Sequence, residues 1–162
     1  MQRFEQIYAE HRDAVRAYVR RRTAADAVDD IVADVFVVCL RRIDDVPRNA
    51  LPWLYAVARN VLANERRKRA RVAPLQRIDV AEPELPADPV LSAAFGRLSD
   101  DDREILRLVA WEGLGFGDVA AALACSRVAA RVRFHRAKRR LAALLDDVPA
   151  ASPRPRAQGV TR

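Results

Sequence analysis

Apolar side chains recur every three or four positions along most of the chain, which is the spacing of a helix with one buried face. In the first half, this spacing predicts helices over residues 2–22, 25–42 and 53–69. The break between the second and third of these helices is the proline-containing stretch DDVPRNALP. The alternating pattern of a β-strand is almost absent, so we expect an all-α fold.

The second half of the chain carries clear helix-start signals. Asp88 followed by Pro89 is a cap with a proline at the first helical position, and Ser99 precedes three acidic residues that suit a helix start. Gly113 is expected to end the second of these helices. A short helix near residues 116–123, a tight turn and a long basic helix to about residue 147 complete the pattern.

Two small helical domains joined by a tether follow from this order of elements. We expect the domains to cover residues 1–70 and 89–147. Residues 71–88 are acidic, contain several prolines and have little periodicity, which predicts a flexible linker. Residues 148–162 are rich in proline and small side chains, which predicts a disordered tail.

The charge of the chain favours an acidic partner. Its 162 residues carry a formal net charge of +7 at pH 7, as many nucleic-acid-binding proteins do. Cys39 and Cys125 each stand alone inside an apolar helical pattern, which favours core thiols over a disulfide or a metal site. The N-terminus is charged and periodic rather than a signal peptide, and no apolar run approaches the roughly 20 residues of a membrane span. A cytoplasmic location is expected.

The segment GDVAAALACSRVAARVRFHRAKRRL has the form of a helix-turn-helix, a DNA-binding motif whose second helix enters the major groove. Between Ser126 and Arg140 it carries seven basic residues and no acidic ones. Such a face suits a phosphate-lined groove. An ordinary basic surface helix is the alternative. The turn, the preceding short helix and the absence of acids together favour DNA binding.

Helical geometry divides this second helix into a buried stripe and an opposite face. The buried stripe is expected to comprise Ala130, Phe134, Ala137, Leu141 and Leu144. Exposed valines among arginines are unusual in solvent but suit the methyl groups of thymine. The candidate duplex-reading residues are Ser126, Arg127, Val128, Arg131, Val132, Arg133, His135, Arg136 and Arg139.

The stretch WLYAVARNVLANERRKRAR combines an apolar stripe with amides and a cationic end. Aromatic, amide and basic side chains together are typical of sites for unpaired nucleotides, which they hold by stacking, hydrogen bonding and charge. Trp53 fits two roles, as a stacking platform or as a core residue. The candidate residues of this site are Trp53, Arg59, Asn60, Asn64, Arg66 and Arg67.

The order VDDIVADVFVVCLRRIDDVP, then WLYAVARNVLANERRKR, then LSDDDREILRLVAWEGLGFGDVAAALACSRVAARVRFHRAKRRL resembles the extracytoplasmic function (ECF) sigma factors of bacterial RNA polymerase, within the sigma-70 family. The resemblance covers about residues 4–70 and 91–145. It implies a sigma factor that directs promoter recognition, promoter melting and transcription initiation. The implied partners are core RNA polymerase, through its β′ clamp and β flap, and promoter DNA, both as duplex and as non-template single strand. An anti-sigma protein is a further candidate partner.

The resemblance also implies roles for particular residues. Asp29, Asp30, Asp34 and Phe36 fall in the helix that docks on the β′ clamp. The helix from Trp53 matches the element that melts and reads the minus-ten box, with Asn60 at the characteristic asparagine. The helix after Ser126 matches the reader of the minus-thirty-five box. The turn departs from the family pattern, because Ala124 stands where a glycine is usual.

Two other classes of function are weighed against this one. The first is a stand-alone helix-turn-helix regulator, in which the N-terminal helices would dimerise or sense a signal. The second is an enzyme, for which His11 and His135 have no nucleophile or carboxylate at motif spacing. The acids Asp29, Asp30 and Asp34 are expected to form a docking face rather than a metal site. No cofactor and no metal are expected.

Overall fold

A computed structural model describes residues 1–72 and 88–147, and in these ranges the chain is helical with no strand. The all-α prediction is confirmed. The N-terminal part contains α1 (Gln2–Arg20), a 3-10 turn η1 (Ala25–Ala27), α2 (Val28–Arg41), a second 3-10 turn η2 (Ile43–Asp45) and α3 (Ala50–Val72). The C-terminal part contains α4 (Pro89–Gly96), α5 (Asp100–Ala110), α6 (Phe116–Ala122) and α7 (Arg127–Asp146). Most of the linker predicted for 71–88 and the whole tail predicted for 148–162 lie outside the described residues.

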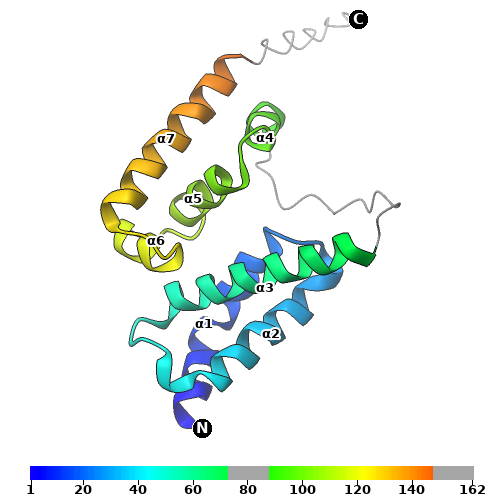
Figure 1. The fold of residues 1–162 in the computed structure, drawn as a ribbon, viewed down its shortest axis with the longest axis vertical. Helices are drawn as coiled ribbons and strands as arrows, with labels where there is room; N and C mark the ends of the chain where they lie inside the picture. The colour runs from blue at the N-terminus through cyan, green and yellow to red at the C-terminus, as the bar shows by residue number, and fades with distance from the viewer. Residues whose placement is uncertain (73–87, 148–162) are drawn as a thin grey trace, which may run out of the picture.

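The first three α-helices form a bundle around an apolar core (Figure 1). Each helix contributes one stripe: Val15 and Tyr18 from α1, Val35 from α2, and Leu54 and Ala58 from α3 are all 1% exposed or less. The rings of Tyr18 and Tyr55 stack with centroids 4.6 Å apart, which joins α1 to α3. Burying these stripes is what makes helices of this length stable.

The helices of the C-terminal bundle begin where the sequence signals predict. The Asp88 side chain accepts from the N–H groups of Val90 and Leu91, at 2.8 and 3.2 Å, with Pro89 at the first helical position. Ser99 and Ser126 cap α5 and α7 in the same way. Each cap satisfies a backbone N–H that the helix leaves free and contributes about 1 kcal/mol.

A tight turn between α6 and α7 completes the helix-turn-helix. Ala124 has φ +50°, the left-handed region that an L-residue adopts at a cost of roughly 1–2 kcal/mol. Its N–H donates to the carbonyl of Ala121 at 3.4 Å, and that of Cys125 donates to Ala120 at 3.0 Å, so both follow the last turn of α6. The usual glycine of this turn is thus replaced by an alanine under backbone strain.

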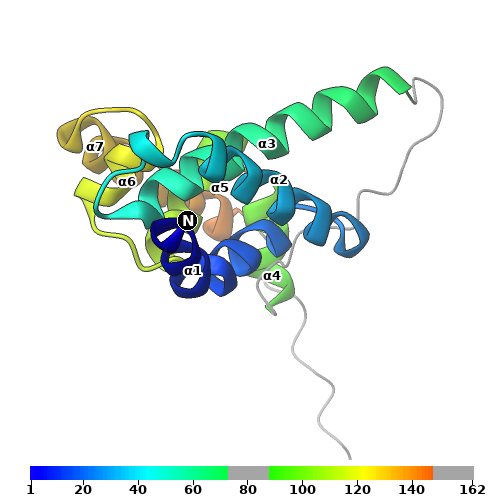
Figure 2. The same cartoon turned by 90° about the horizontal axis from the view of Figure 1, so that it is seen from below.

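The two bundles lie against one another, which the tethered-domain prediction did not anticipate. Helix α3 packs against α6, and the N-terminal part of α3 runs beside the helix-turn-helix (Figures 1 and 2). The Asn49 amide donates to Asp118 across this contact at 3.0 Å. The opposite end of α3 projects beyond both bundles, as the view from below shows (Figure 2).

The strain at Ala124 gives a stability prediction. We expect Ala124→Gly to raise the free energy of unfolding by about 1 kcal/mol, because glycine adopts positive φ without penalty. Urea denaturation of the purified chain measures the change. Ala121→Gly, at an exposed helical position of α6, is the matched control and should lower the free energy of unfolding by about 1 kcal/mol. An equal loss in both variants would contradict the strain at Ala124.

Candidate nucleic-acid interface

Helix α7 is fixed on its bundle by the stripe that the sequence predicts. Ala130 and Ala137 are fully buried, and Phe134, Leu141 and Leu144 are partly buried against the core. The rings of Phe116 and Phe134 meet edge to face at 5.6 Å and join α6 to α7. This packing decides which side of α7 points away from the protein.

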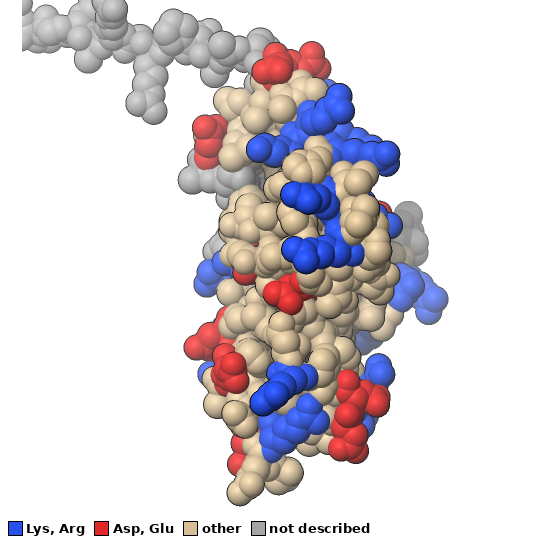
Figure 3. Space-filling model, turned by 90° about the vertical axis from the view of Figure 1, so that its left-hand side faces the viewer, with Lys and Arg blue, Asp and Glu red and all other residues tan. Residues whose placement is uncertain are grey.

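The outward side of α7 is cationic with two apolar side chains. Val128 is 73% exposed and Val132 is 42% exposed, so both apolar side chains are open to a partner. Figure 3 shows Lys and Arg side chains gathered over this part of the surface. All nine residues predicted to read duplex DNA lie exposed on α7 or at its cap.

One basic residue of α7 serves the fold instead. The Arg140 guanidinium donates to both oxygens of Asp102, at 2.9 and 2.7 Å, and so ties α7 to α5. Because Asp102 is only 8% exposed, this ion pair also satisfies a carboxylate that would otherwise be buried alone. Nothing in the sequence indicates this partner, because Asp102 and Arg140 are 38 positions apart.

The polar side of α3 carries the residues predicted for the single strand. Arg59 and Asn60 are exposed, Asn64 accepts a hydrogen bond from Arg67, and Arg66 donates to the carbonyl of Arg22 at 3.4 Å. The five α3 residues lie within nine positions of one helix and are all exposed, so they form one polar surface. It is rich in donors for phosphates and bases.

Trp53 lies at the start of α3 with its ring partly buried against the core. The guanidinium of Arg42 lies 5.8 Å from the ring centroid, within the range of a cation–π contact. Packing on the core explains this position without a nucleotide. Its role as a stacking platform stays a prediction.

The predicted polymerase-docking face of α2 is only partly exposed. Asp30 and Asp34 are exposed, and Asp29 is exposed while pairing with Arg16 at 2.9 Å. Phe36 is only 4% exposed, because its ring packs against those of Phe4 and Tyr8, with centroids 6.4 and 4.7 Å away. Its role in docking stays a prediction, and in this structure the Phe36 ring supports α2 from inside.

Two residues of the same α2 face were missed as candidates. Val37 and Leu40 are 43% and 45% exposed, although both are apolar. Asp30, Asp34, Val37 and Leu40 follow one another at spacings of four, three and three, so they lie on one side of the helix. That spacing was available in the sequence and predicts an acidic face that ends in an apolar patch.

No other chemistry stands out in the part of the chain that the structure describes. Residues 1–72 and 88–147 hold no group of three His, Cys, Asp or Glu side chains that could bind a metal ion. Both cysteines are free thiols. Among the described helices, none has the length and apolar character that crossing a membrane requires.

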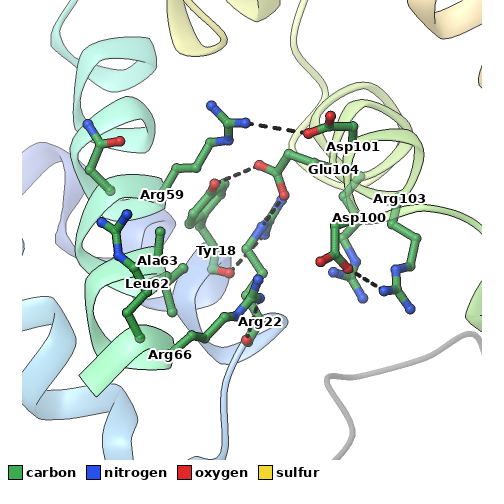
Figure 4. A pocket seen from close by; sticks show the side chains of 13 residues that line it. Tyr18, Arg22, Arg59, Leu62, Ala63, Arg66, Asp100, Asp101, Arg103 and Glu104 are labelled. Carbon is green, nitrogen blue, oxygen red and sulfur yellow. Dashed lines mark hydrogen bonds and ion pairs between the residues drawn. The ribbon is translucent and has the colours of Figure 1, made fainter. Parts of the chain in front are cut away.

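The polar side of α3 faces α5 across a pocket of about 320 Å³ (Figure 4). Helix α3 lines it with Arg59, Asn60, Arg66 and Arg67, and α5 lines it with Asp100, Asp101, Arg103, Glu104 and Arg107. Arg59 pairs with Asp101 at 3.5 Å. A hydrogen bond from Arg103 is the main reason that the pKa of Asp100 lies below its ordinary value.

Two family models match the chain, one in each bundle. The family described as "Sigma-70 region 2" matches residues 7–72, and "Sigma-70, region 4" matches residues 90–141. The ECF RNA polymerase sigma factor EcfG of Rhodopseudomonas palustris (strain TIE-1) is 33% identical over 132 residues, which cover 75% of this chain and 72% of the relative. The chain is an ECF sigma factor.

Other relatives agree. This sigma factor is 30% identical to the RNA polymerase sigma factor CarQ of Myxococcus xanthus over 158 residues, 90% of each chain. Among solved structures it is similar to the sigma factor RpoE of Bartonella quintana in complex with the anti-sigma factor NepR, with a TM-score of 0.68, 25% identity, and 92% and 100% of the two chains covered. CnrH in complex with the cytosolic domain of CnrY gives a TM-score of 0.64 and 28% identity, with 92% of each chain covered.

Family membership decides between the two binding functions left open by the sequence. The protein is an RNA polymerase sigma factor, which directs promoter recognition and transcription initiation, rather than a stand-alone regulator. The helix-turn-helix belongs to its region 4 and the α1–α3 bundle to its region 2.

The exposed valines of α7 give a test of its outer face. We expect the double variant Val128→Ala, Val132→Ala to change the free energy of unfolding by less than about 0.5 kcal/mol, because both side chains are already in solvent. Urea denaturation measures this change. Val119→Ala, at a fully buried position of α6, is the control and should cost about 2 kcal/mol. A large loss in the double variant would mean that the valines belong to the fold.

Proposed function

We propose that three surfaces of this sigma factor divide the work of initiation and that the protein acts by binding, with no chemistry of its own. Helix α7 reads the duplex of the minus-thirty-five box, the polar side of α3 holds the non-template strand of the minus-ten box, and the acidic face of α2 docks on the β′ clamp of core RNA polymerase. The C-terminal domain, 89–147, contacts the β flap. The observation that carries the proposal is the exposed, acid-free cationic face of α7.

The duplex-reading role of α7 rests on charge and shape. Its arginines can reach phosphates on both sides of a major groove, which positions the helix without reading sequence. The exposed Val128 and Val132 lie on the same face and offer apolar contact to thymine methyl groups. The Ser126 cap leaves the start of α7 rigid and free of acids, and this end of a recognition helix meets the base edges.

The single-strand role of α3 rests on its exposed amides and guanidiniums. Asn60 can accept and donate to a base edge, and Arg59, Arg66 and Arg67 can neutralise phosphates. Trp53 lies near the start of the same helix, with the Arg42 guanidinium 5.8 Å from its ring centroid. We assign Asn60 the central role in holding the melted strand.

The docking role of α2 rests on Asp30, Asp34 and the exposed Val37 and Leu40. An acidic rim beside an apolar patch fits a basic, partly apolar helical surface. We also propose that an anti-sigma protein binds this sigma factor, as the name of one similar structure states for RpoE. The protein would act in the cytoplasm, where core polymerase is found.

Transcription in vitro tests the proposed function. Core polymerase and the purified chain should start transcripts from a defined set of sites on genomic DNA, and neither component alone should do so. Mapped start sites then give the promoter sequence. Tight binding of a palindromic duplex by a dimer, without polymerase and without specific transcripts, would be the outcome that refutes the proposal.

Two substitutions separate the surfaces of region 2. We expect Asn60→Ala to lower open-complex formation at least tenfold, as permanganate footprinting measures, while polymerase binding stays within about twofold. Asp34→Arg should do the reverse, because it places a cation on the docking face. Fluorescence anisotropy with core polymerase measures the second effect. Equal loss of polymerase binding in both variants would contradict the division.

A third substitution tests the phosphate contacts of α7. Arg131→Ala in the holoenzyme should weaken promoter binding several-fold and reduce the slope of log affinity against log salt by about 1, as the loss of one phosphate contact does. Gel-shift titrations between low and moderate salt measure the slope. Arg12→Ala, on the exposed side of α1, removes the same charge and should leave the slope unchanged.

A further inference from the structure

The contact between the two bundles is built on a buried arginine. Arg22, just after α1, is 4% exposed. Its Nε donates to Glu104 at 2.8 Å, and its Nη1 donates to Glu112 at 2.9 Å and to the carbonyl of Tyr18 at 2.8 Å. Glu104 and Glu112 belong to the other bundle, so a cation of region 2 has both of its carboxylate partners in region 4.

Neighbouring groups complete this contact. The Tyr18 hydroxyl donates to Glu104 at 2.6 Å, and the Arg21 guanidinium donates to Glu112 at 2.8 Å. Burial is the main reason that the pKa of Tyr18 lies well above its ordinary value, so the hydroxyl keeps its proton and remains a donor. The guanidinium of Arg22 also lies 3.5 Å from the centroid of the Tyr18 ring. We call Tyr18, Arg21, Arg22, Glu104 and Glu112 the interdomain ion cluster.

Charges buried in this way need their partners. The side chain of Glu112 is 3% exposed, and removing one member of such a pair leaves the other desolvated and unpaired, which costs several kcal/mol. We therefore expect the ion pairs of the cluster to form together when the bundles are in contact and to break together when the bundles separate. It is not a set of incidental surface ion pairs, which contribute little.

Closure by this cluster places α5 over the proposed single-strand surface. The acidic first turn of α5 faces Arg59, Asn60 and Arg66 across the pocket, and Asp101 pairs with Arg59 (Figure 4). The pocket of about 320 Å³ is the size of a small-molecule site and cannot hold the roughly four or more nucleotides of a bound strand. Carboxylates thus stand where strand phosphates would bind.

We propose that the interdomain ion cluster holds the free sigma factor in a closed state in which the first turn of α5 covers the minus-ten surface of α3. The strand and α5 compete for the same guanidiniums, so the surface is available only after the two bundles separate. Docking of the two regions at separate places on core polymerase supplies the free energy for separation. This inference rests on the proposed role of Asn60 and its neighbours.

Two buried cationic groups at the contact between the bundles lower the free energy needed to separate them. Arg107 is 6% exposed, and no carboxylate lies within ion-pair distance of it in the described part of the chain. Burial, and then the charge of Arg22, lower the pKa of Arg107 to about 10. In the same ranges the Arg22 Nη2 atom is buried without a hydrogen-bond partner. Both groups regain water when the bundles part, which offsets part of the loss of the cluster.

The test removes the two carboxylates that region 4 contributes to the interdomain ion cluster, without changing side-chain size. In the full chain without polymerase, Glu104→Gln with Glu112→Gln should increase the radius of gyration measured by small-angle X-ray scattering. It should also tighten binding of a non-template minus-ten oligonucleotide, taken from a mapped start site, about tenfold in fluorescence anisotropy. Glu5→Gln with Glu10→Gln, on the exposed side of α1, makes the same change in net charge and should alter neither quantity.

Further variants keep the outcomes distinct. Arg22→Gln breaks the cluster from the other side and should give the same expansion, while circular dichroism checks that each variant stays helical. Adding Asn60→Ala to the opened variant should abolish the gain in strand binding. An unchanged radius in both cluster variants, or expansion without tighter strand binding, overturns the closed state. The proposed function fails separately, if Asn60→Ala leaves promoter opening by the holoenzyme intact.

Discussion

The burial of one stripe of α3 against α1 and α2 decides how the rest of region 2 is used. Leu54, Ala58 and Leu62 are buried and form the apolar stripe by which α3 packs on the core. Burial of this stripe sets the rotation of α3 about its own axis, so Arg59 and Asn60 must lie on the outside. The polar side of α3 is therefore presented by packing, with no loop or hinge required to aim it.

Packing also sets the orientation of α7, where Ala130 and Ala137 are the buried contacts. Small side chains let α7 approach α5 and α6 closely, and the outer face is then free to carry arginines and valines. Both candidate interfaces thus lie on helices whose inner sides are fixed by a core, which holds the outer side chains in register for a regular polymer such as DNA.

Local features of the structure could be predicted from sequence because their causes are local. The caps at Asp88, Ser99 and Ser126, the buried stripe of α7 and the all-α class each depend on residues within a few positions of one another. The rings that cover Phe36 could not be predicted, because they come from α1. The interdomain ion cluster joins residues 82 to 91 positions apart, and no periodicity or motif marks such pairs in advance.

The start of α5 holds together several parts of the molecule at once. Asp100 binds Arg103 within its own helix, Asp101 faces α3, Asp102 holds Arg140 of α7, and Glu104 meets Tyr18 and Arg22 of region 2. Helical geometry points these neighbouring side chains in different directions, so one short run of acids has several independent tasks. Substitutions there are pleiotropic, and adaptation of this sigma factor to a new promoter has more freedom on the outer face of α7 than in this turn.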